Sequence, residues 1–111
     1  MTTIFDKILS GEIPCDEVFS DDKCLAFKDI TPQAPVHILI IPRKPIPSLQ
    51  QIEEEDQALL GHLLLTGKKV ANACGIDSWR TVINTGEKAG QTVFHLHIHI
   101  IGGRKLNWPP G

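Results

Sequence analysis

The sequence has few of the features that mark secreted or disulfide-stabilised proteins. It contains three cysteines in 111 residues, Cys15, Cys24 and Cys74, and no two of them form a Cys-x-x-Cys pair. An odd number of widely spaced cysteines argues against a disulfide framework and against a zinc finger. We therefore expect three reduced cysteines that behave as small hydrophobic residues.

Long hydrophobic runs and an excess of one charge are also missing. No apolar run approaches the roughly 20 residues that cross a bilayer, and the formal net charge is only −2. Residues 1–13 carry Asp6, Lys7 and Glu12 and have the character of neither a signal peptide nor a transit peptide. We expect a cytoplasmic protein that binds neither nucleic acid nor membranes.

The hydrophobic pattern predicts one domain of the α+β class over residues 1–111. Thr3 as N-cap, with Asp6 in the first turn, predicts a short helix that Gly11 ends. Short runs of strand-forming residues predict a mainly antiparallel sheet of five strands. The five predicted strands are 17–20, 24–28, 36–41, 79–84 and 92–101.

One long helix is predicted over residues 52–74, with Gly75 as the signal that ends it. Acidic residues near its start and lysines later in it suit the helix dipole. His62 falls off the apolar stripe and is expected at the surface. The stripe consists of Leu59, Leu60, Leu63, Leu64, Val70, Ala71 and Cys74.

Three of the five histidines lie in one segment, His-Leu-His-Ile-His-Ile-Ile, at residues 95–101. Because a strand turns successive side chains to opposite faces, His95, His97 and His99 should share one face, with neighbours about 6.7 Å apart at Cα. The other face, beginning with Leu96, belongs in the core.

Three uses of this histidine row compete. The row could form the polar outer face of an edge strand, or two of the three could bind zinc together with His37. In the third use, a neutral imidazole attacks phosphorus and its neighbours hold the phosphate. The glycine-containing loop 84–92 favours phosphate, because backbone N–H groups in such a loop can cradle an anion. The strand carries no carboxylate of the kind that a hydrolytic zinc site often recruits.

The chain resembles the histidine triad (HIT) family, and within it the Hint branch. Residues 95–101 match the family signature, in which three histidines alternate with hydrophobic residues. The resemblance extends over nearly the whole chain. The other matching segments are 3–5, 24–30, 32–35 with His37, 41–42, Asn84, 90–91, 102–104 and the Trp-Pro-Pro-Gly ending at 108–111.

The resemblance implies a HIT-like fold whose sheets join across a homodimer. It also implies an enzyme that hydrolyses purine nucleoside 5′-phosphoramidates to AMP or GMP and an amine, with no metal or other cofactor. His97 would be the nucleophile and would form a nucleotidyl-histidine. His99 would contact the phosphate, His95 would orient the surroundings of the nucleophile, and His37 would lie beside the leaving group.

The nucleotide-binding residues follow from the same resemblance. Asp29 would hold the ribose hydroxyls, and Trp108 would approach the site of the partner subunit. The phosphate oxygens would be bound by Asn84, Gln91 and Thr92. The purine would be enclosed by Ile4, Phe5, Ile13, Phe27 and Ile30.

Two positions depart from the family pattern, and other functions stay open. Thr92 stands where serine is common, and Ala89 stands where glycine is common and would be strained at a positive φ. A dinucleoside polyphosphate hydrolase or a nucleotidylyl transferase would use the same nucleophile, although the Trp-Pro-Pro-Gly ending argues against both. A non-catalytic nucleotide-binding or interaction module, or a zinc protein, are the alternatives from other classes.

Overall fold

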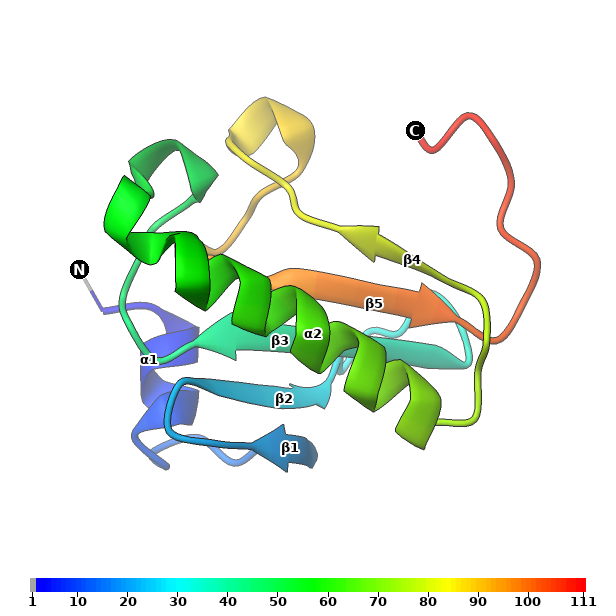
Figure 1. Cartoon of the computed structure of the whole chain (residues 1–111), viewed down its shortest axis with the longest axis horizontal. Helices are drawn as coiled ribbons and strands as arrows, with labels where there is room; N and C mark the ends of the chain where they lie inside the picture. The colour runs from blue at the N-terminus through cyan, green and yellow to red at the C-terminus, as the bar shows by residue number, and fades with distance from the viewer. Residues whose placement is uncertain (1) are drawn as a thin grey trace.

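The computed structural model describes residues 2–111, which form one antiparallel sheet of five strands with one short and one long α-helix (Figure 1). The strands lie in the spatial order β1-β2-β3-β5-β4. They are β1 (Glu17–Ser20), β2 (Cys24–Lys28), β3 (Val36–Pro42), β4 (Trp79–Val82) and β5 (Ile98–Gly102). The helices are α1 (Ile4–Leu9), α2 (Gln57–Ala73) and the single 3₁₀ turns η1 (Leu49–Gln51), η2 (Glu54–Asp56) and η3 (Glu87–Ala89). This confirms the predicted α+β class, the five antiparallel strands and the long helix.

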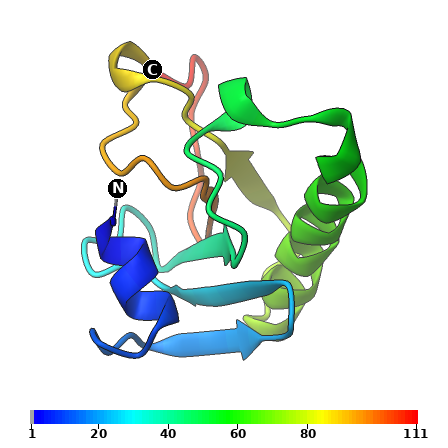
Figure 2. The same ribbon diagram turned by 90° about the vertical axis from the view of Figure 1, so that its left-hand side faces the viewer.

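The two α-helices lie on opposite faces of the sheet (Figure 2). Side chains alternate along the central strand β3, so Ile38 and Ile40 enter the core under α2, whereas Leu39 and Ile41 face α1. Phe5 is the buried residue of α1 and packs in this second cluster. Since His37 precedes Leu39 by two residues, it also belongs to the face on the α1 side.

Helix α1 begins as predicted, at a reciprocal cap. The Asp6 N–H donates to the Thr3 hydroxyl over 3.3 Å, and the Thr3 N–H donates to the Asp6 carboxylate over 2.7 Å. These bonds satisfy backbone donors that a helix start leaves free. Gly11 follows the helix with a φ of +82°, a conformation that glycine adopts without steric cost.

The long helix starts later than predicted, at Gln57 rather than at residue 52. The preceding residues are diverted into the 3₁₀ turn η2, where the Glu53 N–H donates to the Asp56 carboxylate over 2.9 Å. The Asp56 carboxylate also forms an ion pair with Lys44. The acidic run at residues 53–56 therefore forms a capped 3₁₀ turn before the helix rather than the first turn of the helix.

The buried face of α2 also differs from the predicted stripe. Leu64 is 53% exposed, so its assignment to the stripe was wrong, whereas Thr66 and Gly67 are buried. A Cβ on Gly67 would lie 2.9 Å from Cδ1 of Ile100 in β5. The helix comes so close to the sheet at Gly67 that the contact face is centred there, which a count of apolar residues could not reveal.

The fourth and fifth strands are shorter than predicted. The fourth ends at Val82 rather than Asn84, and the fifth starts at Ile98 rather than residue 92. Pairing between β3 and β5 begins at Ile40 opposite Ile98. Upstream of that pair, the Leu96 N–H donates to the carbonyl of Ile46, which lies outside the sheet. Residues 92–97 therefore cross the end of the sheet as irregular backbone.

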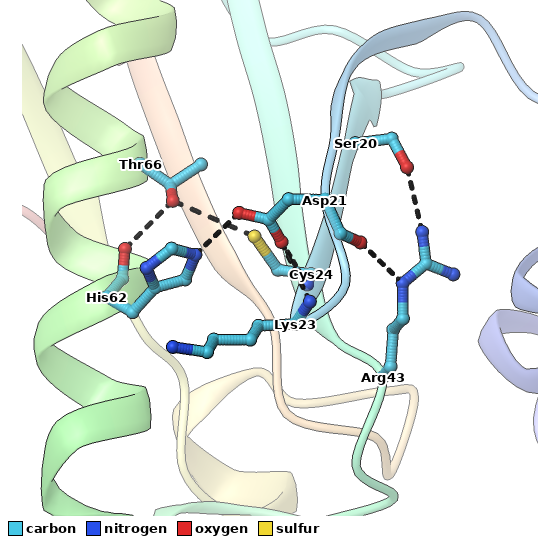
Figure 3. A network of polar contacts seen from close by, with 7 residues as sticks. All are labelled: Ser20, Asp21, Lys23, Cys24, Arg43, His62 and Thr66. Carbon is cyan, nitrogen blue, oxygen red and sulfur yellow. Dashed lines mark hydrogen bonds and ion pairs between the residues drawn. The ribbon is translucent and has the colours of Figure 1, made fainter.

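His62 was expected at the surface, but it is half-buried in a network that ties α2 to the β1–β2 turn (Figure 3). Its Nε2 lies 2.7 Å from Asp21, whose other carboxylate oxygen accepts the N–H groups of Lys23 and Cys24. Burial favours a raised pKa for Asp21, but these hydrogen bonds outweigh it and hold the pKa below the ordinary range. The Thr66 hydroxyl donates to the His62 carbonyl and lies 3.7 Å from the Cys24 sulfur.

The three cysteines are free, and Cys15 is exposed whereas Cys74 is half-buried. Cys24 is fully buried, and burial raises the pKa of its thiol to about 11, so it stays protonated at neutral pH. Among the described residues, no helix has the length and apolar character needed to cross a membrane.

Candidate active site

The three histidines of the site lie partly on a strand and partly on irregular backbone. His99 lies on β5 and pairs with Leu39 of β3 on one side and Val82 of β4 on the other. His95 and His97 lie just before the strand, in irregular backbone, yet the alternation continues through them. Leu96, between them, is buried in the core under α2, as predicted. The histidine side chains consequently turn to the opposite face, on the side of α1.

One nitrogen of His97 is committed to a hydrogen bond and the other is free. Nδ1 lies 2.8 Å from the main-chain oxygen of His95, and because a carbonyl only accepts, Nδ1 must carry the hydrogen. The neutral ring therefore has its lone pair on Nε2. Burial holds the pKa of His97 below its usual value, so the ring is neutral at pH 7. The acceptor that a neutral nucleophile needs is thus present.

His95 is the anchor beneath His97. It is 2% exposed, and its Nε2 donates to the main-chain oxygen of Pro42 over 2.8 Å. Its Nδ1 faces the Asp6 carboxylate of α1 at 3.7 Å. Phe5 contacts both rings edge-on, with centroid distances of 6.2 Å to His95 and 5.0 Å to His97. The backbone carbonyl that orients His97 is therefore held from several sides.

A second chain of hydrogen bonds fixes His99. The Gln33 N–H donates to Nδ1 of His37 over 3.0 Å, so the hydrogen of neutral His37 is on Nε2. That nitrogen lies 2.9 Å from Nδ1 of His99 and donates to it, so His99 in turn carries its hydrogen on Nε2. Within residues 2–111, this buried His99 Nε2–H has no partner. Burial, with His97 and His37 nearby, lowers the pKa of His99 to about 4.

The same hydrogen bonds bear on the zinc alternative. Asp29, His37 and His99 each have a ligand atom within 4.8 Å of the others, and Asp29 lies 3.4 Å from Nε2 of His37. A metal between them would need the lone pair of His37 Nε2. Because His37 Nδ1 already accepts from Gln33, Nε2 carries the hydrogen, and the donor set fits a metal poorly.

His97 and His99 line a largely apolar cavity of about 330 Å³. The other lining residues are Ile4, Phe5, Ile8, Phe27, Asp29, Ile30, Leu39, Thr92 and Val93. A neighbouring cavity of about 290 Å³ shares part of this wall and adds Ile13. The structure thereby brings together the five residues predicted to enclose the base, along with Asp29, Thr92 and two of the histidines.

Asp29 lies in the wall that the two cavities share. One carboxylate oxygen accepts the Thr31 N–H over 2.8 Å and so closes a turn, and the other lies near His37. The side chain keeps 18% exposure. Asp29 therefore has both a structural contact and an open position at the cavity.

Gln91 is engaged inside the protein. Its Nε2 donates to the main-chain oxygens of Pro47 and Val93 over 2.8 and 3.0 Å, and its Oε1 accepts the Gly86 N–H over 2.9 Å. Both amide hydrogens are thus used within the fold, so the side chain holds the loop rather than offering donors to a phosphate. Thr92 beside it does line the cavity.

Asn84, like Gln91, does not line the histidine cavity. It lines another cavity of about 500 Å³, beside the C-terminal tail, and its amide packs near Gly90. Positive φ values in this loop fall on Gly86 and Gly90, and Ala89 has none, so the strain considered for Ala89 does not arise. Trp108 is 80% exposed on the tail, and its contact with a partner subunit stays a prediction.

Sequence reasoning missed several residues of the site. Ile8 follows Ile4 by one helical turn, and Leu39 follows His37 by two strand positions, so periodicity could have placed both in the cavity wall. Gln33 and Pro42 act on histidines through main-chain groups. Such contacts leave no side-chain signal in a sequence.

The fold and the site together define a small α+β protein with a histidine row beside an apolar cavity. The family model described as "HIT domain" matches residues 10–106. The chain therefore belongs to the HIT domain family.

Known proteins are similar to this chain over nearly its full length. The chain is 62% identical over 110 residues to an uncharacterized HIT-like protein of Synechocystis sp., covering 98% of this chain and 96% of the relative. A HIT family hydrolase from Legionella pneumophila superposes with a TM-score of 0.97 at 46% identity, covering 99% of this chain and all of the other (100%). A histidine triad nucleotide-binding protein from Candida albicans gives 0.83 at 30% identity, covering 97% and 83%.

Proposed function

We propose that the protein hydrolyses purine nucleoside 5′-phosphoramidates, such as adenosine phosphoramidate, to a nucleoside monophosphate and an amine. The observation that carries the proposal is the hydrogen-bonded tautomer of His97. Its Nδ1–H is held by the His95 carbonyl, which leaves a neutral Nε2 lone pair at the cavity. The membership of the HIT family and the hydrolase and nucleotide-binding relatives support it.

In the first step, Nε2 of His97 attacks the α-phosphorus and forms a P–N bond. The substrate P–N bond breaks, its electron pair stays on the departing nitrogen, and that nitrogen takes a proton from water at the cavity mouth, which leaves hydroxide. The His95 carbonyl stabilises the positive charge that the His97 ring then carries, because Nδ1–H keeps its acceptor. That hydroxide next attacks phosphorus, the bond between phosphorus and Nε2 breaks with its electron pair on Nε2, the monophosphate leaves, and the ring returns to its neutral form.

His99 supports both steps as a hydrogen-bond donor. Its pKa of about 4 keeps it neutral at pH 7, so it is a poor acid for the leaving nitrogen. Its unpartnered Nε2–H is suited to a non-bridging phosphate oxygen, where charge develops in the transition state. His37 lies behind His99 and keeps that hydrogen on the side of the ring away from itself.

The cavity accounts for the nucleoside part. Its isoleucines and phenylalanines provide apolar walls for a flat purine ring. The Asp29 carboxylate at the shared wall can accept from the two ribose hydroxyls. Thr92 retains a hydroxyl beside the histidines for the phosphate.

We also propose that the enzyme is a homodimer of the Hint type. Two features support this: β4 is an edge strand of the sheet, and Trp108 is 80% exposed on the tail beyond β5. An unpaired strand edge is a ready surface for pairing with another chain. Light scattering of the purified protein should give twice the mass of the chain.

The central test compares His97→Asn with His62→Asn, a histidine that lies outside the cavity. A fluorogenic adenosine 5′-phosphoramidate should be turned over by the natural protein and by His62→Asn, but not by His97→Asn. Rapid quenching should find one nucleotide bound covalently to His97. Binding of AMP by the natural protein without any turnover would contradict the proposal and favour a nucleotide-binding module.

A further inference from the structure

Arg104 makes an unusual contact for an exposed arginine just after the last strand. Its Nε and Nη2 both donate to the main-chain oxygen of Gln33, over 3.1 and 2.9 Å. Its third nitrogen donates to the carbonyl of Lys105 over 3.0 Å. The planar guanidinium thus holds one carbonyl with two donors, which a lysine cannot reproduce.

Gln33 is also the residue whose N–H determines the tautomer of His37. It lies in the connection between β2 and β3, outside regular structure, where no sheet ladder holds its main chain. Besides the grip of Arg104, its side chain donates to the Thr31 carbonyl over 3.0 Å. A shift of this residue would move the N–H away from His37.

We propose that Arg104 is a positioning residue for the histidines. By donating to the Gln33 carbonyl, it keeps the Gln33 N–H on His37. His37 in turn determines which nitrogen of His99 carries the hydrogen beside the cavity. The chain of contacts runs from Arg104 to Gln33, then to His37 and His99, with each donor–acceptor distance between 2.9 and 3.1 Å. The part that concerns rate rests on the proposed function. The part that concerns the tautomer does not.

The backbone before Arg104 is shaped for this contact. Gly103 has a φ of +91°, and a Cβ there would lie 3.0 Å from Cβ of Pro35. Glycine therefore lets the chain turn tightly against the 29–35 connection and brings the next side chain to Gln33. Another residue at position 103 would push the two segments apart.

Loss of the grip has a defined chemical consequence. Without the Gln33 N–H as donor, Nδ1 of His37 can carry the hydrogen, and Nε2 then no longer donates to His99. His99 can in turn place its own hydrogen on Nδ1, which turns Nε2 into an acceptor facing the phosphate oxygens. A lone pair in that position would repel the charge that the natural tautomer stabilises.

The test reads the tautomers directly, by ¹⁵N NMR of the imidazole nitrogens in the full-length protein. The natural protein should show His37 and His99 with their hydrogens on Nε2. Arg104→Gln should give His37 a mixed or reversed pattern, and Arg104→Lys, with a single donor nitrogen, should lie between. The matched control is Arg80→Gln, because Arg80, like Arg104, lines the cavity of about 500 Å³ beside the tail but donates to the Asn107 carbonyl and not to the Gln33 carbonyl.

Activity gives the second readout. Arg104→Gln should lower kcat about tenfold and leave KM within about twofold, because a misplaced catalytic group slows the chemical step.

If Arg104→Gln keeps the natural His37 pattern, or if Arg80→Gln changes it equally, the inference is wrong. An altered pattern with unchanged kcat would also overturn the positioning role. If Arg104→Gln does not fold, the same comparison is made with Arg104→Lys. Absence of turnover in the natural protein would refute the proposed function alone, since the tautomers remain measurable.

Discussion

Replacement of Gln91 by glutamate separates a structural role from a phosphate-binding role at this residue. The two side chains have the same shape, but glutamate cannot donate to the carbonyls of Pro47 and Val93. The two lost hydrogen bonds remove about 2 kcal/mol, and the buried carboxylate oxygen that replaces the donor nitrogen has no partner, which costs at least about 1 kcal/mol more. Since Gln91 is 2% exposed, water cannot solvate that carboxylate oxygen. We expect the free energy of unfolding to fall by about 3 kcal/mol in total.

Thermal unfolding followed by circular dichroism measures this loss. In a chain of this length, 3 kcal/mol corresponds to a fall in Tm of about 10–15 °C. Gln50→Glu makes the same chemical change on an exposed side chain and should shift the stability by less than about 0.5 kcal/mol. A natural Tm for Gln91→Glu together with lost turnover would refute the reasoning, because Gln91 would then act on the substrate and not on the loop.

Three further predictions follow from the site and the core. Because burial lowers the pKa of His97, the rate of nucleotide transfer to His97 should fall to half of its plateau value only below pH 6.5. Rapid-quench rates that halve at or above pH 6.5 would contradict this. Asp29→Asn should raise KM about tenfold for a ribonucleoside phosphoramidate, as expected for a lost charged hydrogen bond, but not for its 2′,3′-dideoxy analogue. In thermal unfolding, Gly102→Ala should lower Tm because its Cβ would lie 2.9 Å from the Ser78 carbonyl oxygen, whereas Gly61→Ala, with open space around it, should add about 0.5–1 kcal/mol of stability.

Local signals in the sequence predicted most of the fold. The Thr3–Asp6 cap, the short strands and the long helix depend on neighbouring residues, and the structure has them. The predicted helix stripe and strand bounds were wrong where contacts with residues distant in the sequence override the local pattern. Leu64 fits a helical stripe, but the sheet meets α2 at Gly67, and Leu64 is left in solvent. The last strand begins late because its first residues bond to Ile46 and to one another instead of to β3.

The histidine site also combines features that the sequence predicts with features that only the folded chain determines. Alternation along residues 95–101 was enough to place the three histidines on one face and the aliphatic residues in the core, because that depends on backbone geometry alone. The proton positions on His95 and His99 depend on acceptors and donors that come from elsewhere in the chain. His37 reaches His99 only after β3 and β5 have paired, and the Pro42 carbonyl reaches His95 from the end of β3. The sequence therefore determined which side chains are available for chemistry, and the tertiary structure decided which nitrogen of each can react.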